Sequence, residues 1–232
     1  MKSKRNVLML VLMLAAGATQ AATSPQLAVQ LWSVKDEIKQ DFEGTLGKLA
    51  KLGFHGVEFA GEFGKYQADP AGLRAFLKQT GLQCAGAHMH VDKLNAANFK
   101  ATTDFYRAVG CNRLIISMDQ RAASKSGSAE LAKELSAISA RLEGQGMQLG
   151  YHNHEQEMLG EQDQTNWDVL AKNTPRNFIL QQDVGWTTFA GKDPVLLRQQ
   201  VSGPHRHHAL QGQVRQGRAG QWRRADHRPG PH

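Results

Sequence analysis

The sequence of 232 residues is poor in cysteine and has no long apolar run. Two cysteines exclude a small fold held together by several disulfides and a structural zinc site built from thiolates. The longest apolar run, Val7 to Ala16, is shorter than the roughly 20 residues that a membrane span needs. No Gly-x-Gly-x-x-Gly motif follows the first predicted strand, which argues against a dinucleotide-binding fold. The remaining composition, 41% hydrophobic and 21% charged, is typical of a globular protein.

The central part of the chain also lacks net charge, although the whole chain carries +7. The first 22 residues contribute +3 and residues 201–232 contribute +5, which leaves −1 for the segment between them. A nearly neutral body has no cationic field to attract phosphate groups. We therefore expect no nucleic-acid partner.

The first 22 residues have the pattern of a secretory signal peptide. Lys2, Lys4 and Arg5 precede the apolar run, and small residues follow it as far as a cleavage pattern at Thr19-Gln20-Ala21. This order of a charged, an apolar and a small-residue segment is typical of signal peptides. We predict an exported, periplasmic protein that has no membrane contact after cleavage and whose folded domain covers residues 23–200.

Export would permit a disulfide bond between Cys84 and Cys111. Each cysteine, however, begins an apolar run that is typical of a strand, where a small buried thiol is the usual occupant. We therefore predict two buried free thiols.

A repeated unit organises residues 26–200. An amphipathic segment, a glycine and a short apolar run recur at Gly53, Gly81, Gly110 and Gly146, with spacings of 28, 29 and 36 residues. A glycine at the end of a helix commonly adopts the left-handed conformation, and these spacings match the length of one βα unit. The predicted strands are 27–32, 55–60, 83–89, 113–118, 147–152 and 178–183; the predicted helices are 40–52, 70–80, 95–109, 129–145, 164–173 and 193–200.

The strands are continuous apolar runs, such as Leu114-Ile115-Ile116, without polar alternation. Such runs are typical of parallel strands that are buried on both faces. Six of them in alternation with helices predict an α/β fold, either a (β/α)8 TIM barrel truncated after about six βα units or a doubly wound sheet.

Polar residues gather at the carboxyl ends of these strands, which is where parallel α/β folds place their sites. We predict catalytic roles for Glu58, His88 and His152. His152 and His154 share one face of a strand, and with Glu157 and Asp183 they offer the mixed nitrogen and oxygen ligands that divalent metals prefer. The predicted metal ligands are His152, Glu157 and Asp183; the predicted substrate-binding residues are Gln30, Trp32, His154 and Trp186.

Four motifs in order resemble those of a known family, the xylose isomerase-like TIM barrels. This group includes sugar phosphate isomerases and epimerases and the inosose dehydratases. The motifs are Gln30–Asp36, Leu52–Glu58, Tyr151–His154 with Glu157, and Asp183–Trp186 with Gly191–Pro194. The resemblance extends from about residue 26 to residue 198.

The resemblance implies a barrel that binds one divalent metal, Mn²⁺, Mg²⁺, Co²⁺ or Zn²⁺, through Glu, Asp, His and Glu on strands five to eight. Asp183 matches the second ligand, and whether His152 or Glu157 is the first stays open. It also implies that the metal stabilises an enediolate of a sugar or keto-sugar while a carboxylate or imidazole moves the proton. The outcome would be isomerisation, epimerisation or dehydration, with Trp32 and Trp186 against the sugar ring.

The resemblance ends at residue 198, and residues 201–232 have a different composition. They hold half of the ten histidines and no Ile, Phe, Met, Tyr, Lys or Glu, which predicts a disordered tail. Read one base later, codons for residues 203–212 are compatible with Gly-Arg-Ile-x-Ile-Met-His-Phe-Lys-Asp, the continuation that the family leads us to expect. We therefore hypothesise a frameshift near residues 199–203, and predict that the chain as printed is poorly folded or inactive. The alternative is a natural His/Arg-rich tail that binds metal or polyanions.

Two other functions compete with a sugar isomerase, epimerase or dehydratase. One is an exported carbohydrate-binding pseudoenzyme. The other is a nuclease of the AP-endonuclease type, which the near-neutral body and the export signal both oppose. The sequence indicates a small-molecule sugar as partner and leaves the particular sugar and the oligomeric state undetermined.

Overall fold

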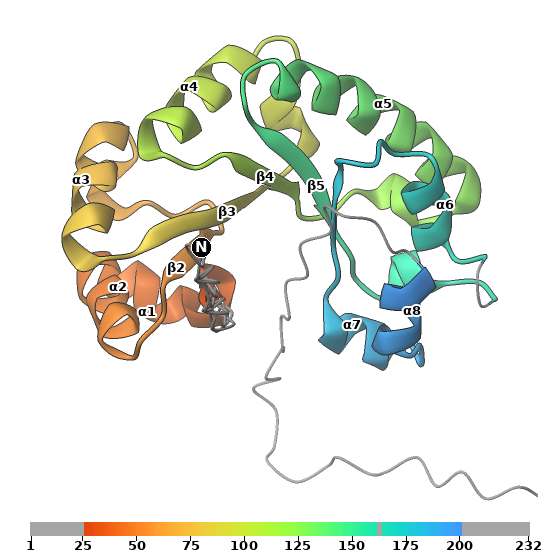
Figure 1. The fold of residues 1–232 in the computed structure, drawn as a ribbon, viewed down its shortest axis with the longest axis horizontal. Coiled ribbons are helices and arrows are strands. Elements are labelled where there is room, and N and C mark those ends of the chain that lie inside the picture. The colour runs from red at the N-terminus through yellow and green to blue at the C-terminus, as the bar shows by residue number, and fades with distance from the viewer. Residues whose placement is uncertain (1–25, 162–163, 201–232) are drawn as a thin grey trace, which may run out of the picture.

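The computed structural model describes residues 26–161 and 164–200, and its sheet is parallel throughout (Figure 1). Six strands lie side by side in chain order, and each pairs in parallel with the next. They are β1 Ala28–Gln30, β2 Gly56–Phe59, β3 Gln83–Met89, β4 Arg113–Ile116, β5 Gln148–His152 and β6 Ile179–Gln181. All six predicted strands are confirmed. The predicted signal peptide and the predicted tail lie outside the described residues.

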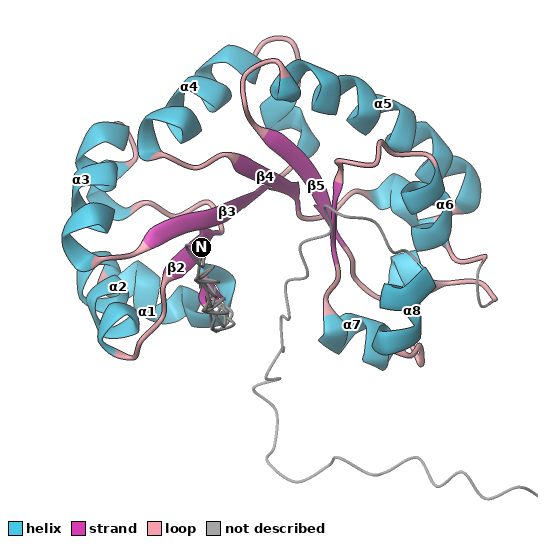
Figure 2. Cartoon of the chain, viewed as in Figure 1, coloured by secondary structure: helices cyan, strands magenta, loops and turns pink. Residues whose placement is uncertain are grey.

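Helices connect the strands, and most of them cover the outer side of this sheet (Figure 2). They are α1 Lys35–Gln40, α2 Phe42–Lys51, α3 Pro70–Thr80, α4 Phe99–Val109, α5 Lys125–Glu143, α6 Asn166–Lys172, α7 Val184–Phe189 and α8 Pro194–Gln200. Sheet and helices curl into an arc that stays open within the described residues, with β1 and β6 at its two edges (Figure 1). This is the predicted TIM barrel, truncated after six βα units. No helix of the described residues is long and apolar enough to cross a membrane.

The helix ends follow from the residues that the sequence places there. Gly53, Gly81, Gly110 and Gly146 all have positive φ angles, between 71° and 91°, as predicted for residues that end a helix in the left-handed conformation. At the other end of α3, the side chain of Asp69 accepts a hydrogen bond from the Gly72 N–H, which satisfies one free donor of the first turn.

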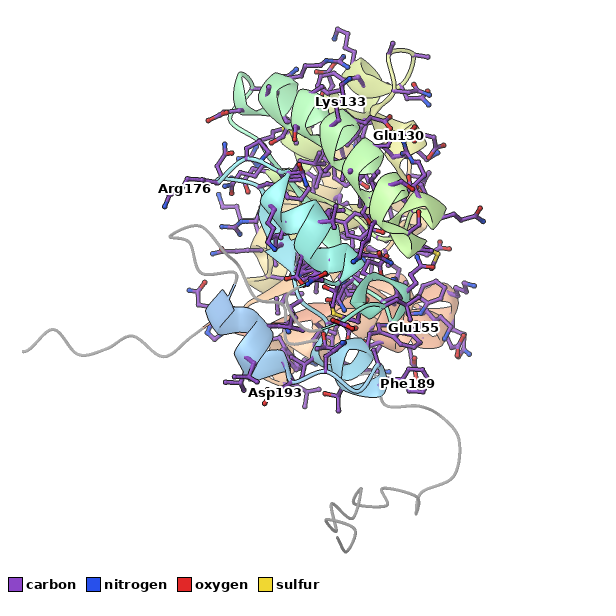
Figure 3. The ribbon with its side chains drawn as sticks, turned by 90° about the vertical axis from the view of Figure 1, so that its right-hand side faces the viewer. Glu130, Lys133, Glu155, Arg176, Phe189 and Asp193 are labelled. Carbon is purple, nitrogen blue, oxygen red and sulfur yellow. A yellow bond between two sulfur atoms is a disulfide. The ribbon has the colours of Figure 1, made fainter. Side chains whose placement is uncertain are left out.

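The helices are amphipathic, and their apolar faces pack on the sheet. In α4 the residues predicted to share one face, Phe99, Thr103, Tyr106 and Val109, are all buried. On α5 the charged residues Glu130 and Lys133 are exposed and point away from the body of the protein (Figure 3). Apolar residues of α5 three and four positions apart form the opposite, buried face, because an α-helix has about 3.6 residues per turn.

Two short helices were not predicted, and both lie in loops at the carboxyl edge of the sheet. α1 follows β1 after one 3₁₀ turn. α7 starts directly after Asp183, whose side chain accepts a hydrogen bond from the Trp186 N–H. Helices of six residues are too short to show a clear hydrophobic period, because they complete fewer than two turns.

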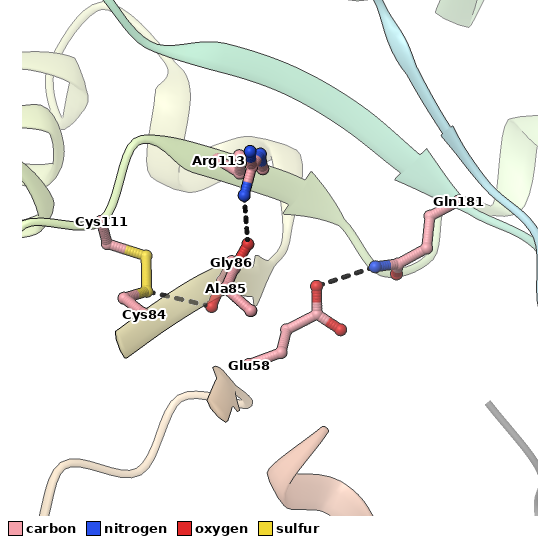
Figure 4. The surroundings of a disulfide bond; sticks show 7 residues. All are labelled: Glu58, Cys84, Ala85, Gly86, Cys111, Arg113 and Gln181. Atoms are coloured by element: carbon pink, nitrogen blue, oxygen red, sulfur yellow. Dashed lines mark hydrogen bonds between the residues drawn. A yellow bond between two sulfur atoms is a disulfide. The ribbon is translucent and has the colours of Figure 1, made fainter. Parts of the chain in front are cut away.

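The prediction of two free thiols is wrong, because Cys84 and Cys111 form a disulfide (Figure 4). Cys84 lies in β3 and Cys111 lies just before β4, and their Cα atoms are 5.1 Å apart. Neighbouring strands are about 4.8 Å apart, so the pairing of β3 with β4 brings the two residues within bonding range. The sequence shows two strand starts, but it does not show the register that places them side by side.

We expect the disulfide to contribute substantially to stability. It joins residues separated by 27 positions, and restricting a loop of that size in the unfolded chain is worth about 3 kcal/mol. Cys84→Ser with Cys111→Ser should therefore lower the free energy of unfolding in urea by about 3 kcal/mol. Reductant should destabilise the wild type equally and leave the double variant unchanged. Equal stability of the oxidised and reduced wild type would contradict this expectation.

Candidate functional site

A cleft of about 820 Å³ opens at the carboxyl edge of the sheet. Six of the residues predicted for catalysis or substrate binding line it: Gln30, Trp32, His88, His152, His154 and Trp186. They come from β1, β3, β5 and the turns that follow β1, β5 and β6. The parallel sheet therefore brings together side chains that are more than 150 positions apart in the sequence.

Glu58, predicted to be catalytic, lies beside the cleft-lining His88 and is not itself among the residues that line the cleft. Its Oε2 is 3.2 Å from His88 Nε2, and both side chains are buried. Gly86 on β3 leaves room for this carboxylate, because a Cβ there would lie 2.8 Å from Glu58 Oε1. Burial acts to lower the pKa of His88, but the contact with Glu58 outweighs it and the pKa is raised.

Gln30 approaches His88 from the other side. Its Nε2 is 3.2 Å from His88 Nδ1. Its Oε1 accepts a hydrogen bond of 2.6 Å from the Trp32 N–H. The backbone therefore fixes the orientation of this amide, and its N–H group faces the imidazole.

Gln181 connects the two buried histidines, and sequence reasoning missed it. Its Nε2 donates to Glu58 Oε1 at 2.7 Å (Figure 4). Its Oε1 is 2.7 Å from His88 Nε2 and 2.9 Å from His152 Nδ1. Gln181 ends β6 and pairs in register with His152. Strand periodicity places it on the same face as Asp183, which is the signal that could have identified it.

His152 and Asp183 face each other, with His152 Nε2 3.6 Å from Asp183 Oδ2. Asp183 is completely buried, and its Oδ2 has no hydrogen-bond partner among the described residues. Burial raises the pKa of Asp183 to about 6, although the backbone N–H groups of Trp186 and Gly185 act to lower it. Burial and the neighbouring His88 and His154 hold the pKa of His152 well below its usual value. The space between the two side chains is therefore suited to a proton, a hydroxyl group or a cation.

Glu157, predicted as a metal ligand, accepts hydrogen bonds from the protein. The Tyr151 hydroxyl donates to its Oε1 at 2.8 Å, and the His154 N–H donates to its Oε2 at 2.7 Å. The 3₁₀ turn Gln156–Met158 carries this residue, and the bond to the His154 N–H holds its carboxylate against the backbone at the end of β5. Glu157 also raises the pKa of Tyr151, after burial, which is the larger cause.

The predicted ligand set does not form a metal site by itself. The described residues contain no group of three or more His, Cys, Asp or Glu side chains that could hold a metal ion. His152 Nε2 and the unbonded Asp183 Oδ2 are a nitrogen and an oxygen donor of the kind that divalent metals prefer. The two atoms therefore supply part of a donor set, and the metal stays a prediction.

Rings line one side of the cleft. His88, His152, His154 and Trp186 follow one another with centroid distances of 4.8, 5.2 and 5.5 Å. Trp32 lies in the same cleft and is 52% exposed. Aromatic faces of this kind can pack against the C–H surface of a sugar ring. His90 and Lys93, neither of them predicted, also line the cleft, whereas no carboxylate does so among the described residues.

No family profile and no curated protein matches the sequence. Solved structures share its fold. A sugar phosphate isomerase/epimerase from Parabacteroides distasonis has a TM-score of 0.66 at 20% identity, over 79% of this chain and 73% of that one. A probable 3-DHS dehydratase from Bacillus anthracis has a TM-score of 0.59 at 16% identity, over 79% and 72% of the two chains. The chain therefore shares its fold with a sugar phosphate isomerase/epimerase and a probable dehydratase, in agreement with the TIM barrel that the sequence predicted.

Proposed function

We propose that this protein is a sugar isomerase, epimerase or dehydratase that takes a proton from the carbon next to a carbonyl group. The observation that carries the proposal is the pair of His152 Nε2 and Asp183 Oδ2, 3.6 Å apart, beside a cleft lined by histidines and tryptophans. The fold, shared with proteins described as isomerases, epimerases and a dehydratase, supports the same reaction class.

In this proposal His152 and Asp183 act together as the base. His152 lines the cleft and receives the proton on Nε2, while the adjacent carboxylate stabilises the imidazolium that forms. With a pKa of about 6, Asp183 is ionised at neutral pH and close to the operating range that favours proton transfer. Such a tightly interacting pair titrates as a unit.

Of the two buried imidazoles, His88 holds a proton more readily, because Glu58 raises its pKa, whereas the pKa of His152 is lowered. Environments that push the pKa values of two neighbouring groups apart are typical of an acid and a base. Return of the proton to another carbon gives isomerisation, and return to the opposite face gives epimerisation. Loss of a hydroxyl group from the next carbon gives dehydration.

Gln30 and His154 would bind the hydroxyl groups of the sugar, and Trp32 and Trp186 would pack against its ring. All four line the cleft. The Nδ1 of His154 is buried and has no hydrogen-bond partner among the described residues.

A divalent metal would be held by the same His152 Nε2 and Asp183 carboxylate together with at least one donor beyond the described residues. Because Nε2 has one lone pair, the metal site and the base are alternative uses of this pair. When bound, such an ion polarises a carbonyl oxygen and stabilises negative charge on it. Because two donors bind weakly, we expect the chain as printed to retain no stoichiometric Mn²⁺, Mg²⁺, Co²⁺ or Zn²⁺ after dialysis, as measured by elemental analysis. Full occupancy after dialysis would contradict this expectation.

Export is part of the proposal, and the disulfide supports it. Disulfides form and persist in oxidising compartments such as the bacterial periplasm. The bond between Cys84 and Cys111 is therefore compatible with the predicted signal peptide. Mass spectrometry of the protein from periplasmic extracts should find an amino terminus close to Ala22.

The second candidate is a carbohydrate-binding pseudoenzyme. It is favoured by one observation, that aromatic and imidazole side chains line the cleft whereas no carboxylate does so among the described residues. Binding without catalysis would need the cleft and its aromatic residues but not the buried pair.

The test is hydrogen–deuterium exchange in D₂O, followed by NMR at the carbon next to the carbonyl group of a panel of ketoses and keto-sugars. We would use the chain as printed and a frame-restored chain, made by shifting the reading frame by one base from codon 203. We expect exchange from the frame-restored chain and none from the chain as printed. Sugar binding without exchange in the frame-restored chain would favour the pseudoenzyme, and neither binding nor exchange would contradict both.

A further inference from the structure

We infer that Gln181 is a positioning residue that determines which ring nitrogen of His88 and of His152 carries the proton. Gln181 is buried and contacts both imidazoles and the carboxylate of Glu58. The inference rests on the proposed function for its catalytic meaning, but its physical content can be measured without turnover.

The orientation of the Gln181 amide follows from its contact with Glu58. An ionised carboxylate only accepts hydrogen bonds, so the group that faces Glu58 Oε1 at 2.7 Å must be the amide N–H. The carbonyl oxygen of the amide then points the other way, toward the two imidazoles. Because this oxygen only accepts, each ring nitrogen that contacts it must carry a proton.

The consequence for His152 is a single neutral tautomer. Its Nδ1 is 2.9 Å from Gln181 Oε1 and therefore carries the proton. A neutral imidazole has one N–H group, so Nε2 keeps its lone pair. That lone pair belongs to the nitrogen that lies 3.6 Å from Asp183 Oδ2. Gln181 thus makes Nε2 an acceptor, as a base or a ligand atom requires.

The consequence for His88 can be checked against an independent contact. Its Nε2 lies 2.7 Å from Gln181 Oε1, so neutral His88 carries its proton on Nε2. Its Nδ1 then keeps a lone pair and can accept a hydrogen bond. Gln30, whose orientation is fixed by the Trp32 N–H, presents its own N–H to that Nδ1 at 3.2 Å. Two glutamines, each oriented by a different partner, therefore require the same tautomer.

The test is ¹⁵N NMR of histidine side chains in the full chain, which distinguishes protonated from unprotonated ring nitrogens. In the wild type we expect His152 in the Nδ1–H form and His88 in the Nε2–H form when neutral. Gln181→Met, which keeps the volume and removes the acceptor, should move His152 from Nδ1–H alone to a mixture with Nε2–H. Gln30→Met should alter His88 and leave His152 unchanged.

Gln182 supplies a matched control. It is the adjacent glutamine, it is 6% exposed like Gln181, and its amide donates to the Pro194 carbonyl instead. Gln182→Met should therefore leave both tautomers unchanged, although it replaces a buried glutamine and removes the hydrogen bond to Pro194.

An Nε2–H form of His152 in the wild type would overturn the inference without recourse to any variant, and so would an unchanged His152 in Gln181→Met. The expected tautomers together with absent deuterium exchange in the frame-restored chain would leave the inference standing and remove the proposed function. The two can therefore fail separately.

Discussion

Asp183→Asn in the frame-restored chain is expected to lower the rate of deuterium exchange by about 10²- to 10⁴-fold, the usual contribution of a proton-transfer group. The same substitution is expected to stabilise the fold at neutral pH. The amide oxygen of the variant could still accept the hydrogen bond from the Trp186 N–H that Asp183 Oδ1 accepts at 2.8 Å. The amide N–H would face the lone pair of His152 Nε2 in place of a carboxylate oxygen that has no partner among the described residues.

The sign of the pH dependence follows from the direction of the pKa shift. The pKa of Asp183 is raised from 3.8 to about 6 in the folded protein, so folding favours the protonated form. As the pH rises from about 4 to about 6, the unfolded chain ionises first and the wild type loses stability. Above pH 6 the free energy of unfolding of the wild type has fallen by the full amount, roughly 3 kcal/mol. Asp183→Asn has no such loss and should be more stable than the wild type by up to that amount.

The measurement is urea unfolding between pH 4 and pH 8 after treatment with a chelator, so that no metal holds the carboxylate. Asp119→Asn is the matched control, because Asp119 also caps a helix at a strand end. Burial acts to raise the pKa of Asp119, but Arg121 holds it below its usual value. Asp119→Asn should therefore lower the free energy of unfolding by about 1 kcal/mol. A destabilised Asp183→Asn at pH 8 would refute the assignment of an unfavourable buried charge.

The βα repeat could be predicted from sequence because each element satisfies a local rule. The four glycines of the repeat have positive φ and end helices or helical turns, and continuous apolar runs give buried parallel strands. The disulfide could not be predicted in this way, because it depends on the register of β3 against β4. That register is a property of the folded sheet and of no single segment.

The candidate site also contains residues that could be predicted from the sequence and residues that could not. His88 and His152 were found because strand ends of a parallel sheet meet at one edge. Gln181 was missed because an amide titrates at no relevant pH and has no acid–base chemistry of its own, although it contacts three predicted catalytic side chains. The spacing of Glu157 from His154 does not show that the His154 N–H binds its carboxylate, and the role of Glu157 as a metal ligand stays a prediction.

The frame-restored chain is expected to differ from the chain as printed in its unfolding as well as in its activity. Within the described residues β1 and β6 each pair along one edge only, and unpaired strand edges promote association between chains. Val195 and Leu196 of α8 are 61% and 43% exposed. An eight-stranded barrel has two further βα units, and a restored frame that supplies them would pair both edges and cover apolar surface of this kind.

We expect the frame-restored chain to unfold in one cooperative transition, with a free energy in the usual range of about 5–15 kcal/mol. The chain as printed should unfold over a broad range of urea concentration and associate as its concentration rises. Calorimetry and light scattering measure the two properties. The matched control is a chain that ends at residue 200, which we expect to behave like the chain as printed, because the composition of residues 201–232 predicts a disordered tail. A single sharp transition in the chain as printed would show that the six-stranded arc is a complete fold and would remove the reason to postulate a frameshift.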